Sequence, residues 1–304
     1  MRAARIFAVM LSVTVLPAAA AALRLPSAPR CPVFPRSSPW NRRVDRLPVA
    51  ANSATLVQSI GLAAGLHADF GSGTWNGGPI GIPFDVVTRA TRRTKVSFEY
   101  VDESDRVGYP IPKRVHIEYG SDHHALLVER DACRLYELGG LTRASGRWRA
   151  WAGAVWNLRS NRLRPAGWTS ADAAGLPIFP GLARWDEVRR GVIDHALRFT
   201  APRTRRAYIY PARHYASSST DPSLPPMGLR MRLKASFDVR PFPRQARIVL
   251  VALKHYGMLL ADNGASWYVS GAPNPRWSND QLHTLGRVKG SDFEVVDASS
   301  LRPR

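Results

Sequence analysis

Short segments with alternating apolar and polar residues dominate the sequence from Lys95 onward. Clear examples are KVSFEYV, RVHIEYG, HHALLVE, CRLYEL and RMRLKASF, and Gly, Pro, Asp or Asn residues separate them. A period of two predicts half-buried β-strands, and closely spaced turn residues are typical of antiparallel sheets. The sequence therefore predicts a mainly β fold, a single-domain antiparallel β-sandwich or jelly-roll-like structure, with two or three helices.

Helices are expected where this alternation is interrupted. ANSATLVQSIGLAAGL starts with an Asn/Ser capping signal and spaces its apolar residues for a short helix. A second helix is predicted from Trp185 to about Ile193. A third, from Pro243 to Leu260, has apolar positions that wrap widely around it, which indicates a mostly buried helix ending before DNG.

The chain is expected to divide into three parts. Residues 1–22 join a basic start to an apolar run and a small-residue tract, which predicts a secretory signal peptide. Residues 23–50 are Pro-rich and predict an extended N-terminal arm. Residues 51–304 contain no Ser/Gly-rich linker and predict a single β-rich domain. Since no later segment is long and apolar enough to span a bilayer, we expect a secreted or periplasmic protein without stable membrane insertion.

The two cysteines, Cys31 and Cys133, are expected to form a disulfide, because lone cysteines in an oxidising compartment most simply pair. This bond would tie the N-terminal arm to the hairpin SDHHALLVERDACRLYEL. Within that hairpin, Leu126 and Val128 are expected in the core. Glu129, Asp131 and Glu137 are expected at the surface.

The formal charge of +20 arises mostly from arginines spread over the whole length. Such a surface attracts anionic partners, among which acidic polysaccharide fits an exported protein. No helix-turn-helix, RNP-like or zinc-finger pattern is present, so nucleic acid is not an expected partner.

The start of the hairpin contains the first group of reactive side chains. If a turn occupies residues 120–122, His124 shares a strand face with Leu126 and Val128, while His116 and Glu118 share a face of the preceding strand. His124 is then either a buried, satisfied histidine or a residue at the edge of a cleft.

A second candidate is the loop GWTSADAAGLPIFPG, which is braced by prolines. Rigid loops on a β-scaffold often hold functional residues. Asp172 is the preferred functional carboxylate here, and the alternative is that it caps a turn. Trp168 in the same loop is a candidate platform for a sugar ring.

A third group follows in the segments IDHALRFT, YPARHYA and LRMRLKA. Arg230, Arg232 and Lys234 are expected on one strand face, which is either solvated or in contact with negative charge, because buried cations are costly. No HExxH or HxH spacing is present and the serines lack a GxSxG elbow, so neither a metal nor another cofactor is expected.

The runs GWTSADAAGLPIFPGLARWDEV, IDHALRFT, PPMGLRMRLKA and GMLLADNGASWYVSGAPNPRW carry a resemblance over most of the chain. In these segments the protein resembles a widespread group of uncharacterised exported bacterial proteins that share a GWTSADAAGLPI-type motif. The resemblance implies a single exported domain and assigns no catalytic residue.

These patterns favour a carbohydrate-active protein outside the cytoplasm, in the first place a polysaccharide hydrolase. Glycoside cleavage commonly uses two carboxyl groups that flank the bond. A lyase on acidic glycans and a carbohydrate-binding or cell-surface module without turnover are the alternatives. The expected catalytic residues are Asp172, Glu118, Asp122 and His124, and the expected substrate-binding residues are Trp168, His195, Arg213, His214, Arg230 and Arg232.

Overall fold

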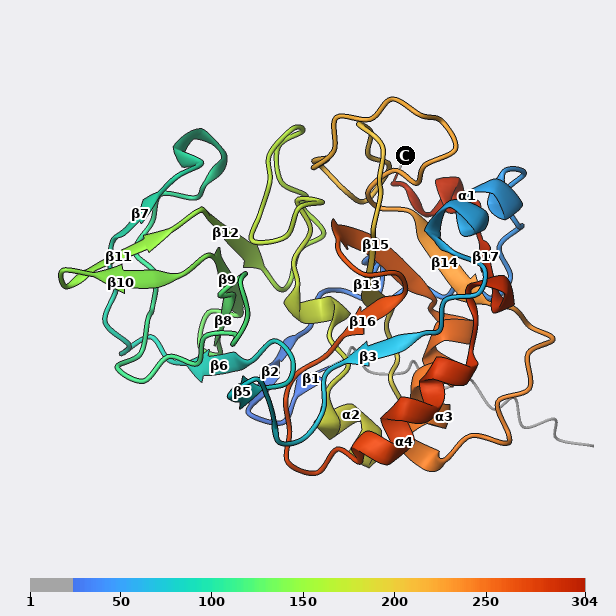
Figure 1. Ribbon diagram of the computed structural model, residues 1–304. Coiled ribbons are helices and arrows are strands. Elements are labelled where there is room, and N and C mark those ends of the chain that lie inside the picture. The colour runs from blue at the N-terminus through green and yellow to red at the C-terminus, as the bar shows by residue number, and fades with distance from the viewer. Residues whose placement is uncertain (1–23, 304) are drawn as a thin grey trace, which may run out of the picture.

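The computed structural model describes residues 24–303, which form two lobes that lie side by side in Figure 1. The predicted signal peptide lies outside the described residues. The large lobe contains a six-stranded sheet and the helices, and the small lobe contains the strands from β6 to β12. Within residues 24–303, no helix is long and apolar enough to cross a membrane.

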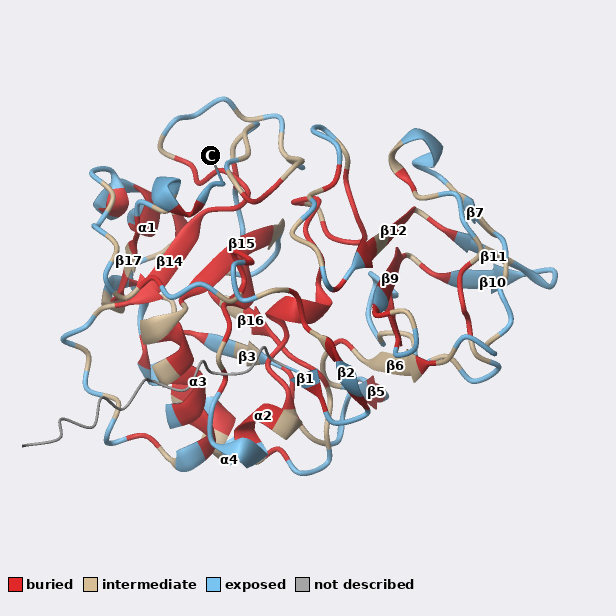
Figure 2. Ribbon diagram, turned by 180° about the vertical axis from the view of Figure 1, so that it is seen from behind, coloured by how far each residue is buried: buried red, intermediate tan, exposed pale blue. Residues whose placement is uncertain are grey.

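The large lobe is built on a mixed sheet. Its strand order is β17 (Phe293–Val295), β14 (Arg230–Leu233), β15 (Met258–Asn263), β13 (Leu197–Ala201), β16 (Tyr268–Ser270) and β3 (His67–Asp69). The central strands and much of α3 are buried, as Figure 2 shows. The four α-helices of the described residues are α1 (Ser53–Ile60), α2 (Trp185–Arg190), α3 (Arg244–His255) and α4 (Asn279–His283).

The small lobe contains two sheets. The first has the order β12 (Ala152–Asn157), β9 (Arg134–Gly139), β8 (Ala125–Glu129) and β6 (Phe84–Val87). The second has the order β10 (Thr142–Ala144), β11 (Arg147–Ala150) and β7 (Val96–Phe98). Leu126 and Val128 pack into one apolar cluster, and Ala125 and Leu127 into another, so strand β8 is buried on both faces.

Two hairpins and five 3₁₀ turns complete the described elements. The hairpins are β1 (Arg24–Leu25) with β2 (Ala28–Pro32), and β4 (Thr74–Trp75) with β5 (Gly78–Pro79). The turns are η1 (Val101–Glu103), η2 (Phe179–Gly181), η3 (Thr284–Arg287), η4 (Gly290–Asp292) and η5 (Ser299–Leu301). The predicted N-terminal arm thus includes a short hairpin.

The prediction of a β-rich fold with few helices is confirmed, but the expectation of purely antiparallel pairing is wrong. Strand pairs β13–β15, β16–β3, β6–β8 and β11–β7 are parallel. The chain between β13 and β15 contains β14 and α3, which is long enough to return it to the same end of the sheet. A sandwich or jelly-roll arrangement is not confirmed.

Three local expectations also differ from the structure. The helix expected to reach Leu260 ends at His255, because Gly257 adopts a left-handed conformation (φ 65°) and the chain enters strand β15. The segments RVHIEYG and AYIYPAR form no strand. Glu129 and Glu137 are buried rather than exposed. The carboxyl group of Glu137 accepts hydrogen bonds from the amides of Ile178 and Phe179, and burial raises its pKa to about 8, so it is mostly uncharged at neutral pH.

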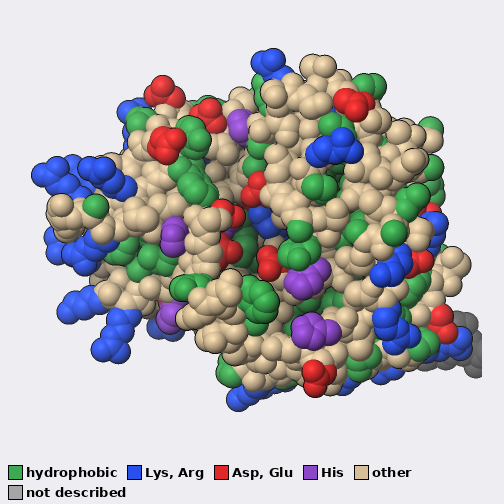
Figure 3. All heavy atoms as spheres, in the orientation of Figure 1, with side chains coloured by type: hydrophobic (Ala, Val, Ile, Leu, Met, Phe, Trp, Pro, Cys, Tyr) green, Lys and Arg blue, Asp and Glu red, His purple; other side chains and the backbone are tan. Residues whose placement is uncertain are grey.

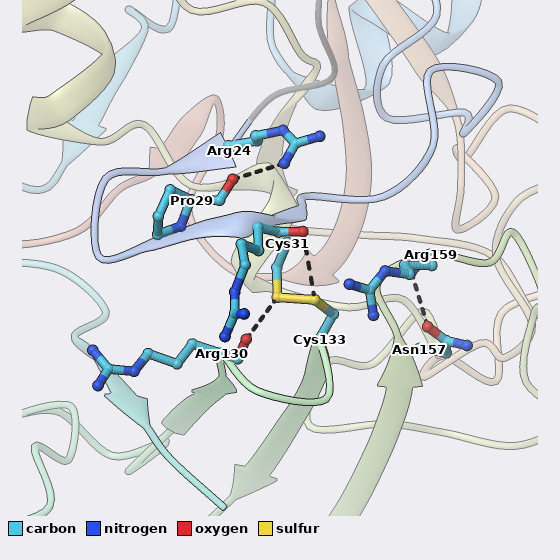
Figure 4. Close-up of a disulfide and its surroundings, with 8 residues drawn as sticks. Arg24, Pro29, Cys31, Arg130, Cys133, Asn157 and Arg159 are labelled. Carbon is cyan, nitrogen blue, oxygen red and sulfur yellow. Dashed lines mark hydrogen bonds between the residues drawn. A yellow bond between two sulfur atoms is a disulfide. The ribbon is translucent and has the colours of Figure 1, made fainter.

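The predicted disulfide between Cys31 and Cys133 is confirmed, and Figure 4 shows its surroundings. It joins strand β2 to the turn between β8 and β9, across a sequence separation of 102 residues. Both cysteines are buried among apolar side chains. The bond therefore fixes the N-terminal hairpin to the small lobe.

Candidate functional site

A groove between the two lobes is lined by carboxyl, histidine and aromatic side chains from both lobes. It has a volume of about 510 Å³. In Figure 3, acidic side chains and histidines gather around the hollow that separates the lobes on this face. The small lobe and η1 contribute Tyr100, Glu103, Asp122 and Trp151, and the large lobe and its loops contribute residues 169–173, His214, Tyr215, Ala216, Asp262 and Asn263.

Arg198 on strand β13 organises the large-lobe wall of the groove. Its Nε donates to Asp172 Oδ2 at 2.8 Å, and its Nη2 donates to Asp172 Oδ1 at 2.8 Å and to Asp262 Oδ2 at 3.1 Å. Its Nη1 donates to Ser270 Oγ at 2.8 Å. The guanidinium is buried and holds two carboxyl groups next to each other, which is the geometry that Arg favours.

A β-bulge in strand β15 brings Asp262 to this cluster. Phe199 is opposite Leu260, but Thr200 is opposite Asp262, so Ala261 is an extra residue in the strand. Because residues opposite each other share a face, the bulge places Asp262 on the face of Thr200 and Arg198. In regular register Asp262 would be opposite Ala201, on the other face.

The extra residue also anchors the loop that carries Asp172. The amide of Ala174 donates to the carbonyl of Ala261 at 2.9 Å. Within the loop, Ser170 Oγ accepts from the amide of Asp172 at 2.9 Å and donates to the carbonyl of Leu176 at 2.7 Å. Gly175 has a φ of 66°, and a side chain there would meet the carbonyl of Trp168. Asp172 is therefore held by an ordered loop, and its carboxylate binds Arg198 instead of capping a turn.

Asp262 is the carboxyl group of this pair that reaches solvent. Its side chain is 22% exposed, whereas that of Asp172 is 0% exposed. Burial and the negative charge of Asp172 raise the pKa of Asp262 to about 7, although Arg198 opposes this shift. With this pKa, Asp262 is about half protonated at neutral pH and holds its proton more fully below pH 7. Such a group suits general acid catalysis.

His124 and Glu118 form an ion pair beneath the groove. His124 Nδ1 lies 2.5 Å from Glu118 Oε2, and its Nε2 donates to the carbonyl of Ala171 at 2.9 Å. Burial by itself would lower the pKa of His124, but the Glu118 carboxylate raises it to about 9. The doubly protonated ring can donate from both nitrogens. It therefore ties the start of strand β8 to the loop that carries Asp172.

Five of the predicted site residues are brought together. Asp122, Asp172 and His214 line the groove, and Glu118 and His124 lie next to it. His214 Nδ1 donates to the carbonyl of Ala173 at 2.8 Å, and the ring stacks on Tyr215. Their catalytic roles stay predictions.

Two predicted residues lie on the far side of the same loop. Trp168 faces a separate pocket, where its ring contacts the guanidinium of Arg164. Arg213 Nε donates to the carbonyl of Arg164 at 2.8 Å. Neither is among the residues that line the groove.

The remaining three predicted residues are buried elsewhere in the large lobe. His195 Nε2 lies 3.0 Å from Glu187 and is 0% exposed. The guanidinium of Arg230 donates to the carbonyls of Pro39, Arg42 and Tyr256. Arg232 pairs with Glu294 and donates to two carbonyls of the N-terminal segment. The expectation of a solvated face is therefore wrong for these two arginines, since both are buried and donate to backbone carbonyls, whereas the expected contact with negative charge is present at Arg232, which pairs with Glu294.

The sequence interpretation missed Asp262 and Arg198. Asp262 follows the apolar run MLLA, which was assigned to the end of a helix, so its place at the end of a buried strand was overlooked. Read as a strand, MLLADN would have marked Asp262 as a polar residue at a strand end. Arg198 interrupts the apolar strand LRFTA, and an arginine in such a strand indicates buried hydrogen-bond acceptors, because Arg is almost never fully buried without a partner.

Comparisons with protein-family models, with curated proteins and with solved structures found no significant match. Among residues 24–303, no cluster of three or more His, Cys, Asp or Glu side chains is arranged to hold a metal ion. The function of the groove is therefore argued from its own side chains.

Proposed function

We propose that the protein is a glycoside hydrolase that cleaves a polysaccharide in the groove between the lobes. The observation that carries the proposal is Asp262, a carboxyl group with a pKa of about 7 at the wall of a groove that also contains carboxylates and aromatic rings. A glycosidase needs one protonated and one ionised carboxyl group on opposite sides of the scissile bond. The groove offers both from different lobes.

Asp262 is the general acid in this proposal. It donates its proton to the glycosidic oxygen as the bond to the leaving sugar breaks. Asp172 cannot contact a substrate, because Arg198 covers both of its oxygens. Asp172 is therefore a positioning residue that orients Arg198 and keeps the proton on Asp262, which changes the role expected for it from the sequence.

Asp122 is the proposed partner carboxylate. It is exposed and comes from the small lobe, and within the described residues its carboxylate accepts only from the neighbouring Ser121 hydroxyl. The other groove carboxylate of the small-lobe side, Glu103, already accepts from the amide of Thr169 at 2.7 Å. Asp122 is thus the freer group to activate water or to attack the anomeric carbon.

Aromatic side chains at the groove supply platforms for sugar rings. Trp151 packs over Gly139 and Gly140, whose lack of side chains leaves room for the indole. Tyr100 is exposed, and Tyr215 is half-buried against the parallel ring of His214. Stacking of sugar rings on such surfaces orients a polysaccharide without requiring charge.

We also propose that the protein acts outside the cytoplasm, in a secreted or periplasmic location. The N-terminal sequence pattern and the buried disulfide support this location.

The test is a panel of soluble polysaccharides incubated with the purified mature protein. We expect new reducing ends from at least one polymer, without the absorbance of unsaturated uronates that a lyase would produce. Asp262→Asn and Asp122→Asn should each abolish this release, whereas the exposed Asp280→Asn should retain it. Unsaturated products, or full activity of Asp262→Asn, would show that the assignment is wrong. Binding without any product would leave the alternative of a carbohydrate-binding module.

A further inference from the structure

A cationic face on the small lobe adjoins the groove and has no part in the proposed chemistry. We call it the β7–β11 face and define it by Lys95, Ser97, Arg147 and Arg149. In Figure 3, basic side chains gather on the side of the molecule where Figure 1 places β7, β10 and β11. The three cations of this face are exposed.

The alternation of the two strands creates this face. In β7 and β11, Val96, Phe98, Trp148 and Ala150 pack against the apolar cluster of the small lobe. Their neighbours Lys95, Ser97, Arg147 and Arg149 therefore point to the opposite, solvent-facing side. The parallel register sets Trp148 beside Val96 and Arg149 beside Ser97, which places Arg147 next to Lys95.

These cations repel one another, and no carboxylate of the described residues pairs with them to offset the repulsion. Arg147 and Arg149 are about 7 Å apart on one strand, and like charges on neighbouring strands are destabilising. Two carboxylates on the small-lobe side bind other arginines, since Glu129 pairs with Arg93 and Asp105 with Arg164. Among the described residues, no ion pair is formed by Lys95, Arg147 or Arg149. The face is therefore suited to a ligand that carries several negative charges.

The same two strands continue directly into the groove. The amide of Glu99 donates to the carbonyl of Ala150 at 3.1 Å, and that of Tyr100 donates to the carbonyl of Trp151 at 2.8 Å. Tyr100 and Trp151 are groove residues. A chain that occupies the groove can thus extend along β7 and β11 toward the cations, past Glu99, the acidic residue at the groove end of these segments.

We infer that the β7–β11 face is a binding site for an anionic polysaccharide that extends from the groove. This inference names the substrate class of the proposed hydrolase and rests on that function only for turnover, since binding can occur without cleavage. A polymer fits better than a small anion because the cations form a row that leads away from the groove.

The test measures binding to polygalacturonate with the Asp262→Asn protein, so that cleavage does not interfere. The face variant carries three further substitutions that remove the positive charges of the face: Lys95→Gln, Arg147→Gln and Arg149→Gln. A matched control carries Arg46→Gln, Arg203→Gln and Arg247→Gln, three exposed arginines elsewhere, and changes the net charge equally. We expect the face variant to lose about tenfold in affinity and the control variant less than about twofold, because exposed charge contacts are individually weak but add up. Thermal unfolding of both variants should match that of the parent.

Three outcomes would overturn the inference. The parent protein does not bind polygalacturonate, or the face variant and the control variant lose equal affinity. In the third, the protein binds anionic phospholipid vesicles through the β7–β11 face but does not bind polygalacturonate. The two proposals can fail separately. If a neutral polymer is cleaved and the anionic polymer is not bound, the hydrolase proposal stands and the inference fails. If binding depends on the β7–β11 face but no polymer is cleaved, the inference stands and the hydrolase proposal fails.

Discussion

Asp172 and Asp262 both accept hydrogen bonds from one nitrogen of Arg198, its Nη2, at 2.8 Å and 3.1 Å. A buried guanidinium balances one ionised carboxylate, and Asp172 already binds it through two oxygens. A second ionised carboxylate would give the buried cluster of Arg198, Asp172 and Asp262 a net negative charge. Asp262 is therefore the member that retains a proton, which makes it the more suitable acid.

The first prediction concerns the pH dependence of the proposed hydrolysis. A general acid must be protonated, and the pKa of Asp262 is raised to about 7. Activity should therefore fall about tenfold per pH unit on the alkaline side of this value. The alkaline limb of the pH–rate profile is measured from initial rates of reducing-end release at saturating substrate, with the stability of the protein checked at each pH. Activity that stays constant up to pH 9 would contradict the assignment.

The second prediction concerns Asp172→Asn. Removing the negative charge of Asp172 lowers the pKa of Asp262, because the amide no longer opposes its ionisation. The alkaline limb should then move to lower pH, and the maximal rate should fall less than in Asp262→Asn. Loss of a buried ion pair also lowers the free energy of unfolding by about 3 kcal/mol. A limb that moves to higher pH would be inconsistent with this role.

A third prediction follows from the pair of His124 and Glu118. The folded protein raises the pKa of His124 from 6.5 to about 9, so its contribution to stability is full below pH 6.5 and is lost as the pH rises toward 9. At pH 6 this contribution is about 3 kcal/mol. The pKa of Glu118 is lowered, because its bonds to charged His124 outweigh the effect of burial, and this part is lost in acid.

His124→Gln should therefore be less stable than the parent at pH 6, and the difference should shrink toward pH 9. Urea unfolding at both pH values measures it. His116→Gln, which changes an exposed histidine paired with Asp85, is the matched control and should change stability by less than about 1 kcal/mol. An equal difference at pH 6 and pH 9 would mean that the ring is not charged in the folded protein.

The fourth prediction concerns the disulfide. Replacing Cys31 and Cys133 together by Ser should lower the free energy of unfolding by about 4 kcal/mol, because the bond closes a loop of 102 residues in the unfolded chain. Reductant should lower the melting temperature of the parent and leave that of the double variant unchanged. A parent that is insensitive to reductant under denaturing conditions would argue against a closed bond.

Several features could be predicted from local sequence. The alternation in KVSF and RWRA specifies which side chains of β7 and β11 face the core, because side chains alternate along any strand. Two cysteines allow one intramolecular pairing. His124 and Glu118 are six residues apart, so their contact needs little more than one turn of the chain.

Asp262 and Arg198 could not be recognised in the same way. Their meeting depends on a parallel pairing across 64 residues and on one extra residue, Ala261, which places Asp262 on the face of Arg198. Local periodicity contains no information about such pairing. Arg230 and Arg232 show the converse error, since their alternation suggested a solvated face, whereas both are buried and donate to carbonyls of the N-terminal segment.

The sequence by itself therefore determined the β-rich composition of the fold and the disulfide, since each depends on residue type and short-range alternation. Only the tertiary structure decided that Asp172 and Asp262 share Arg198 at the wall of a groove that Asp122 also lines. The physical reason is that the pKa of a buried carboxyl group depends on which charged groups are buried next to it. The order of strands in the sheet determines which groups, distant in sequence, become neighbours.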